Sequence, residues 1–215
     1  MSAAEPQAQP LSAGHSPYPG VVSPDAPLQG TASLRVLTAG YLGRRFASTV
    51  TFVRDGAALI VVNPGMVADI ESILGPLRYL GVRPAAVTDV VLLATRPAHI
   101  VNAALFPAAR LHDATAVYHN DTKARRPADR FLVSPSARLI QTPGHHPDDL
   151  TLLVATPRGI VAVTHLWSSR SDGAERPLDG DPGTLRRAKT RVLGVASRIV
   201  PAHGAAFRAG PDTPV

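Results

Sequence analysis

The stretch Leu139-Ile-Gln-Thr-Pro-Gly-His145 decides the fold, because a histidine stands directly after a short apolar run and a Pro-Gly turn. The apolar run predicts a strand, and Pro-Gly predicts its end. Three more histidines, His99, His165 and His203, also stand just beyond apolar runs. Ligand sites in α/β sheets gather at the carboxyl ends of the strands. The four histidines are therefore predicted to meet at one end of a folded sheet.

Strand-like and helix-like patterns fill the chain on both sides of this stretch. Asp55-Gly56 predicts a hairpin turn between two β-rich runs. Apolar residues at helical spacing predict a helix over residues 67–80, which Gly81 ends. The predicted strands cover residues 33–39, 48–54, 57–62, 87–93, 115–118, 138–141, 150–155, 160–163 and 198–200; two further helices are predicted over residues 100–106 and 182–195, with a polar loop over 169–182.

The patterned region is flanked by segments of different composition. Residues 1–32 are rich in Pro, Ala, Ser and Gly without hydrophobic periodicity, which predicts a disordered tail. Residues 33–209 are the predicted domain, and residues 210–215 a short C-terminal tail. A chain of 215 residues can bury one hydrophobic core. The sequence thus predicts a single α/β domain.

The composition excludes cysteine chemistry, and the hydrophobic pattern argues against a membrane-spanning segment. The chain has no cysteine, so disulfides, thiolate metal ligands and cysteine nucleophiles are excluded. No apolar run approaches the roughly 20 residues that cross a bilayer. The N-terminus also lacks the pattern of a signal peptide. These features predict a cytoplasmic protein without membrane contact.

The chain is basic, with a formal net charge of +6 and a pI near 10.5. Such a charge can indicate an acidic partner. However, the basic residues are scattered, aromatic residues are only 5% of the chain, and the composition is typical of a GC-rich genome. Composition therefore explains the charge better than nucleic-acid binding does. The predicted partner is an anionic small molecule, and nothing in the sequence specifies nucleic acid.

The four histidines that follow strands are metal-ligand candidates. Imidazole is a common zinc ligand, and three of them can hold the ion with one position open. A single histidine is more often hydrogen-bonded or exposed. The shared placement of the four makes a metal site as good an explanation as a structural one. His15, His112 and His119 lack this setting and are predicted to be structural or solvated, and His146 is only the neighbour of His145.

Five segments, in chain order, resemble the metallo-β-lactamase superfamily. Thr142-Pro-Gly-His145 matches its third motif outright. Asn102-Ala-Ala-Leu-Phe-Pro107 is similar to a run in the short group called metallo-β-lactamase domain-containing protein 1. The resemblance spans about residues 34–208. The remaining segments are Leu59-Ile-Val-Val-Asn-Pro-Gly65, Val90-Val-Leu-Leu-Ala-Thr-Arg-Pro-Ala-His99, Val161-Ala-Val-Thr-His165 and Pro201-Ala-His-Gly204.

The resemblance implies a four-layer αββα sandwich with metals in a groove at one sheet edge. The family usually binds two zinc ions and hydrolyses esters, thioesters, amides or phosphodiesters with metal-activated water. This chain departs from the family pattern at the ligands themselves. The first two family histidines fall on Ala94 and Arg96, and the family aspartate falls on Ala98. Asn63 replaces the aspartate of the first motif, and His165 replaces the bridging aspartate.

These departures imply that at most one metal is held. The first metal would retain only His145, and Arg96 would place a permanent cation in its space. The second would retain His99 and His203 and gain His165, which gives three neutral imidazoles. One Zn²⁺ is therefore the predicted cofactor, with no cofactor as the alternative.

Three hypotheses follow, in this order. First, the chain has lost dinuclear zinc hydrolysis and keeps the groove for ligand binding or regulation, with Arg96 and Asn63 as ligand-binding candidates. Second, it is a single-metal hydrolase that uses His99, His165 and His203. Third, it works without metal, with His145 or His165 as general base and Arg96 stabilising an oxyanion.

Overall fold

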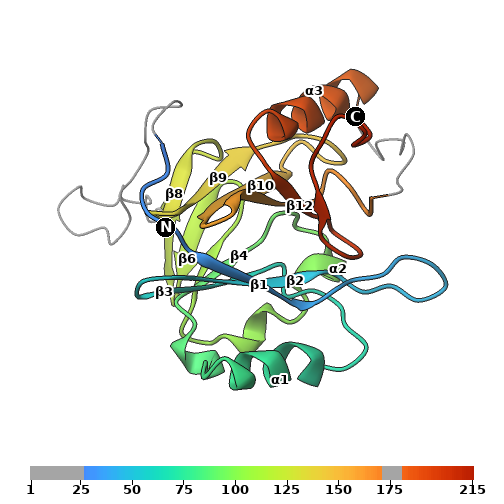
Figure 1. The fold of residues 1–215 in the computed structure, drawn as a ribbon. Coiled ribbons are helices and arrows are strands. Elements are labelled where there is room, and N and C mark those ends of the chain that lie inside the picture. The colour runs from blue at the N-terminus through green and yellow to red at the C-terminus, as the bar shows by residue number, and fades with distance from the viewer. Residues whose placement is uncertain (1–26, 171–180) are drawn as a thin grey trace, which may run out of the picture.

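The computed structural model describes residues 27–170 and 181–215. Within these residues, a seven-stranded sheet and a six-stranded sheet form the two inner layers. Figure 1 shows helix α1 (Glu71–Tyr79) outside the first sheet and helix α3 (Pro182–Leu193) outside the second. The predicted four-layer αββα sandwich is thus confirmed. No helix of the described residues is long and apolar enough to span a bilayer.

The first sheet carries its strands in chain order. Strands β2 and β3 form the predicted hairpin, and Gly56 in its turn has a φ of +59°. Strand β4 pairs in parallel with both β3 and β5, and the other neighbours are antiparallel. The strands are β1 (Ser33–Thr38), β2 (Val50–Asp55), β3 (Ala58–Val62), β4 (Asp89–Val91), β5 (Arg110–His112), β6 (Ala116–His119) and β7 (Thr122–Arg125).

The second sheet has the order β13-β12-β11-β10-β9-β8. Strand β10 is antiparallel to both β9 and β11, and β11 is parallel to β12. Strands β9, β11 and β12 therefore run in one direction and end at the same edge. The strands are β8 (Phe131–Ser134), β9 (Ala137–Gln141), β10 (Leu150–Thr156), β11 (Gly159–Thr164), β12 (Arg198–Val200) and β13 (Phe207–Arg208).

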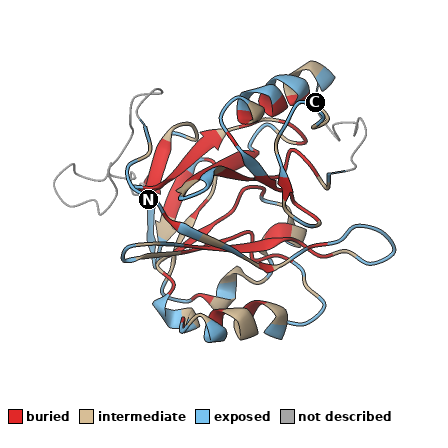
Figure 2. Ribbon diagram, in the orientation of Figure 1, coloured by how far each residue is buried: buried red, intermediate tan, exposed pale blue. Residues whose placement is uncertain are grey.

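Three apolar clusters hold the layers together. The central cluster lies between the sheets and includes Val62 and Leu139, both fully buried. The second joins α1 to the first sheet through Ile73 and Leu77, and the third joins α3 to the second sheet through Val192. Figure 2 shows these buried residues along the strands and on the sheet-facing sides of the helices. The apolar residues of the predicted strands are thus the ones that become buried, on one or both faces of each sheet.

Helix boundaries differ from the predictions in two places. The helix predicted over residues 67–80 begins only at Glu71, and just before it the Asp69 carboxylate accepts a hydrogen bond from the Glu71 N–H (3.0 Å). The helix predicted over residues 100–106 is instead α2 (Pro97–Ile100) followed by a 3₁₀ turn over Ala103–Leu105. Proline favours the first position of a helix, which explains the earlier start.

Four strands were not predicted, namely β5, β7, β8 and β13. They are short, with two to four residues each, and β7 is largely exposed and polar. Their own sequence carries little periodicity, so they form because a neighbouring strand supplies the hydrogen-bonding partner.

Residues 27–32 and 210–215 contact the domain, although both segments were predicted as tails. The Gln29 N–H donates to the Pro135 carbonyl (3.0 Å), and the Ala32 N–H donates to the Ala155 carbonyl (2.8 Å). At the other terminus, the Trp167 indole N–H donates to the Pro214 carbonyl (2.7 Å). The predicted tail over residues 1–26, with His15, and residues 171–180 of the predicted loop lie outside the described residues.

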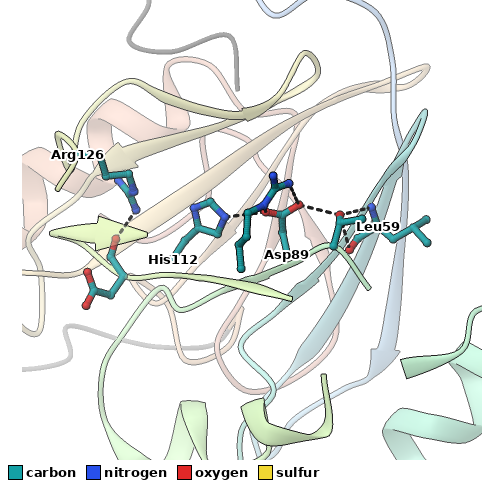
Figure 3. A network of polar contacts seen from close by, with 7 residues as sticks. Leu59, Asp89, His112 and Arg126 are labelled. Carbon is teal, nitrogen blue, oxygen red and sulfur yellow. Dashed lines mark hydrogen bonds and ion pairs between the residues drawn. The ribbon is translucent and has the colours of Figure 1, made fainter. Parts of the chain in front are cut away.

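A buried carboxylate joins β4 to β5 (Figure 3). Asp89 is fully buried and accepts two hydrogen bonds from the Arg110 guanidinium, both 3.0 Å. Burial lowers the pKa of His112 although Asp89 opposes the shift, so a neutral imidazole donates to Asp89 Oδ1 (2.8 Å). Thr88 donates to Asp89 Oδ2 (2.7 Å) and bonds both backbone groups of Leu59 on β3. His112 is therefore structural, as predicted.

Candidate metal centre

Four histidines stand at one edge of the two sheets, where strands of the same direction end. His145, His165 and His203 follow β9, β11 and β12. His99 lies on α2, which follows β4 and lies near that edge in Figure 1. All four are at most 8% exposed. The convergence predicted from the sequence is therefore present, and burial separates the imidazoles from bulk water.

Three of the four histidines form a tight group. His99, His165 and His203 each offer one ring nitrogen, and these atoms lie within 4.8 Å of one another. His99 Nε2 and His165 Nε2 are 2.9 Å apart. The His145 ring centroid is 5.2 Å from that of His165, and His145 is not a member of the group. The geometry therefore separates His145 from the three candidate ligands.

Ser48 sets the tautomer of His99. The Ser48 hydroxyl donates to the Ala98 carbonyl (2.7 Å), and its oxygen lies 2.9 Å from His99 Nδ1. Because that hydroxyl proton is already used, His99 Nδ1–H must be the donor in the second bond. The Nε2 lone pair of His99 is then left for a ligand or a metal.

Ala47 has the same effect on His203. The Ala47 carbonyl can only accept, so His203 Nδ1–H donates to it (2.8 Å) and Nε2 carries the lone pair. The Phe46 ring packs edge-on against His203, with ring centroids 4.4 Å apart. Metal-ligating histidines commonly donate their second ring N–H to a carbonyl or a similar acceptor. Residues 46–48 were not identified from the sequence, because nothing in their pattern signals this contact.

Gly65 allows the histidine-bearing loop to come this close. A Cβ at Gly65 would stand 2.1 Å from the Ala98 carbonyl oxygen and 2.6 Å from the His99 Cα. No side chain fits such a space. Gly65, which ends the first sequence motif, therefore allows α2, and with it His99, to lie against the end of β3.

Two of the candidate ligands, His99 and His165, are neutral at neutral pH. Burial, followed by the positive charges of His203 and Arg96, lowers the pKa of His99 to about 4. Burial, followed by the charges of the neighbouring histidines, lowers the pKa of His165 well below its ordinary value. A metal ligand must be deprotonated. His99 and His165 can therefore accept a cation without first releasing a bound proton.

We expect the metal-free protein to lose stability as the pH falls from 6.5 toward 4. In this window the unfolded chain binds protons on His99 and His165, whereas the folded chain does not, so the unfolded state is favoured. One pKa unit is worth about 1.4 kcal/mol, so His99 alone contributes on the order of 3 kcal/mol. Urea unfolding of chelator-treated protein at pH 7.5, 6 and 5 measures this loss.

A His99→Gln variant should flatten that pH dependence, because the titrating group is removed. The matched control is His119→Gln at the exposed end of β6, which should leave the pH dependence as in the wild type. Equal free energies of unfolding at pH 7.5 and pH 5 would contradict the neutral state of the buried histidines.

Arg96 lies beside the centre at the N-cap position of α2 and is partly buried. Its charge lowers the pKa of both His99 and His165, so the guanidinium lies within electrostatic reach of them. Among the described residues it forms no ion pair or side-chain hydrogen bond. The Arg96 charge also acts on the Asp149 carboxylate, and a role for Arg96 in binding an anionic ligand stays a prediction.

The two remaining predicted site residues, Asn63 and His145, are each fixed by a hydrogen bond within the fold. Asn63 is 3% exposed at the end of β3, with a φ of +50°, and its Oδ1 accepts from the Leu93 N–H (2.8 Å). Its amide oxygen therefore orders the segment after β4. The Asp149 carboxylate accepts from the His145 N–H (3.0 Å) and fixes the turn that carries this histidine. Burial raises the pKa of Asp149.

The three histidines of the described residues fit one zinc-like ion. Zinc–nitrogen distances of about 2.0–2.1 Å at tetrahedral angles place ligand nitrogens roughly 3.3 Å apart. The 2.9 Å between His99 Nε2 and His165 Nε2 is within a few tenths of this spacing. Ala94 and Ala98 stand where the family pattern has ligands, and alanine cannot coordinate. The residues present can thus hold a single ion.

Comparison with known proteins agrees with this fold. The chain is 30% identical over 195 residues to metallo-β-lactamase domain-containing protein 1 of Xenopus laevis, covering 82% of this chain and 81% of that protein. A metallo-β-lactamase-like structure from Thermotoga maritima matches with a TM-score of 0.65 and 19% identity, over 83% of this chain and 100% of the other. The di-iron-bound form of TTHA1623 matches with a TM-score of 0.61 and 18% identity, over 82% and 98%.

No family model matches the chain. The solved structures support the fold, and the curated relative, together with the ordered motifs around the histidine group, supports the family. The chain therefore belongs to the metallo-β-lactamase superfamily, within the group of metallo-β-lactamase domain-containing protein 1.

Proposed function

We propose that this chain is a hydrolase that works with one metal ion, Zn²⁺, held by His99, His165 and His203. The observation that supports this most is the closeness of their three ring nitrogens, all within 4.8 Å. The tautomers support it further, because Ser48 and Ala47 each engage an Nδ1–H and leave Nε2 for the ion. When bound, the ion would acidify a water molecule and polarise the scissile group of a substrate.

The neighbouring side chains suggest an anionic substrate. The Arg96 guanidinium lies within electrostatic reach of His99 and His165 and would pair with a carboxylate or phosphate group next to the scissile bond. The His145 ring stands against His165 and is positioned to exchange a proton with a bound substrate. An ester, thioester or phosphodiester that carries a negative charge is the substrate class that suits these groups.

Ligand binding without hydrolysis is the second candidate function. It is favoured by the loss of three family ligand positions to Ala94, Arg96 and Ala98. Metal-free catalysis is supported less well, because a base must hold a proton during turnover. Burial and the adjacent histidines disfavour the protonated form of His165, which makes it a weak base.

Metal analysis of tag-free protein separates the two leading functions. The proposal expects close to one zinc ion per chain and hydrolysis of a chromogenic ester, thioester or phosphodiester that chelation removes and zinc restores. Absence of metal, with a thermal unfolding temperature that neither chelator nor added zinc changes, would support ligand binding instead and overturn the proposal.

Arg96→Ala tests the choice of substrate. We expect kcat/KM for a negatively charged substrate to fall about ten- to hundred-fold, because a charge-assisted hydrogen bond contributes roughly 1.5–3 kcal/mol. A neutral ester of the same leaving group should be hydrolysed at the wild-type rate. Arg83→Ala, which removes an equal charge from an exposed position away from the histidines, is the control. Equal losses on both substrates would contradict a specific role in anion binding.

A further inference from the structure

A groove of about 620 Å³ opens between the two sheets at the end opposite the histidines. It is lined by the first residues of β1, the turn between β10 and β11, and the ends of β12 and β13. Arg158 in this turn and His165 lie at opposite ends of β11. At about 3.3 Å per residue, the six-residue strand places the groove about 20 Å from the metal centre. The groove is therefore a separate feature of the molecule.

Two arginines point into this groove from adjacent strands. Ile199 and Phe207 are opposite each other across β12 and β13 and pack beneath α3. Because side chains alternate along a strand, the next pair, Arg198 and Arg208, points to the other face, toward the first sheet. Residues directly opposite on paired strands have Cβ atoms about 4.5–5.5 Å apart. The fold thus places two arginines directly opposite each other on the groove-facing side of β12 and β13.

Among the residues that the structure describes, no carboxylate offsets this charge. Arg35 and Arg158 also line the groove, and none of the described lining residues is a carboxylate. Across residues 27–170 and 181–215, none of these four guanidinium groups forms an ion pair or a hydrogen bond. Like charges directly opposite on paired strands destabilise a sheet. A bound anion would remove this repulsion, so the groove has a chemical reason to take one.

We propose that this groove binds a small molecule that carries a diphosphate group, with Arg158, Arg198 and Arg208 as its main contacts. Guanidinium groups match phosphate oxygens in geometry and charge, and four of them complement the charge of a diphosphate. The volume is typical of a small-molecule site and exceeds that of a diphosphate alone. Leu34 and Val161 supply apolar surface for the organic part of the ligand.

A nucleic-acid chain fits this surface less well. Its binding calls for a basic track with aromatic side chains on which bases stack. None of the described residues that line the groove is aromatic, and the arginines converge on one cavity. A compact phosphorylated molecule therefore suits the groove better than a polymer does.

Titration calorimetry with pyrophosphate, ADP and adenosine tests the proposal on the full chain. We expect pyrophosphate and ADP to bind and adenosine not to bind. The double variant R158A/R198A should weaken both phosphate ligands at least tenfold, and Arg208→Gln should weaken them in the same direction. All three arginines are exposed, so these changes leave the core intact.

A matched double variant separates specific binding from general charge effects. R83A/R186A removes two exposed arginines that lie outside the groove and should change affinity less than twofold. Equal losses in both double variants would overturn the proposal, as would failure of pyrophosphate and ADP to bind at millimolar concentration. Binding that is lost in His165→Ala but kept in R158A/R198A would assign the phosphate to the metal centre instead. An affinity that rises with oligonucleotide length while pyrophosphate does not bind would favour a polymer and also overturn the proposal.

Discussion

Replacing His165 with alanine is expected to reduce bound zinc from about one ion per chain to nearly none. The change removes one of three nitrogens that lie within 4.8 Å of one another, and it leaves two imidazoles. Two neutral ligands fall short of the three or four protein ligands typical of zinc sites. Hydrolysis should fall more than a hundredfold with the metal. Elemental analysis after gel filtration, together with the activity assay at a fixed zinc concentration, measures both losses.

Two further variants are expected to give a partial loss of zinc binding and no loss. Ser48→Ala keeps all three ligands but removes the acceptor for His99 Nδ1–H, so zinc affinity should fall about 10- to 100-fold. His119→Ala removes an exposed histidine on β6 and should leave the metal content unchanged. Full zinc occupancy in both His165→Ala and His203→Ala would show that other residues hold the ion, and it would overturn the proposed centre.

Replacing Asp89 with alanine should produce the largest loss of stability among the variants considered. The change leaves the Arg110 guanidinium and the buried His112 without their acceptor. Removing one partner of a buried ion pair costs roughly 3–5 kcal/mol. For a domain of this size, that corresponds to a fall in Tm of about 10 °C. Urea unfolding and thermal denaturation of the same sample measure the two quantities.

The exposed Arg78–Glu71 pair on α1 supplies the control. Its side chains are 70% and 54% exposed, so Glu71→Ala should cost less than about 1 kcal/mol. Asp89→Asn should be intermediate, because an amide oxygen still accepts from His112 while the charge opposite Arg110 is lost. A cost for Asp89→Ala as small as that for Glu71→Ala would show that the buried network contributes little to folding.

Much of the fold was predictable because many strands are marked in the sequence by apolar runs and turn residues. Strands β2 and β3 were recognised from apolar runs and a turn that favours a hairpin. The helix over residues 182–195 was predicted almost to its observed end at Leu193, and Asp181 caps it by accepting from the Gly183 and Thr184 N–H groups. Strands such as β7 and β13 were missed because their stability comes from neighbours and not from their own residues.

The candidate site was predictable only in part. His99, His165 and His203 share one sequence signature, a polar residue just beyond an apolar run, and strand direction brings such residues together. The segment over residues 46–48 has no such signature. Its contacts reach His99 and His203, which are 51 and 156 positions away in the sequence. Only packing of the two sheets could place them together.

By itself, the sequence predicted a single α/β domain with histidines just beyond its apolar runs, because hydrophobic periodicity is a local property. The αββα sandwich was implied by the resemblance of five segments to the metallo-β-lactamase superfamily. Tertiary structure alone decided how close the three histidines lie, which tautomers His99 and His203 adopt, and that Arg158, Arg198 and Arg208 share a groove in which no described residue is a carboxylate. These outcomes depend on distances between segments far apart in the chain. Such distances are fixed only when the hydrophobic surfaces of the two sheets pack together.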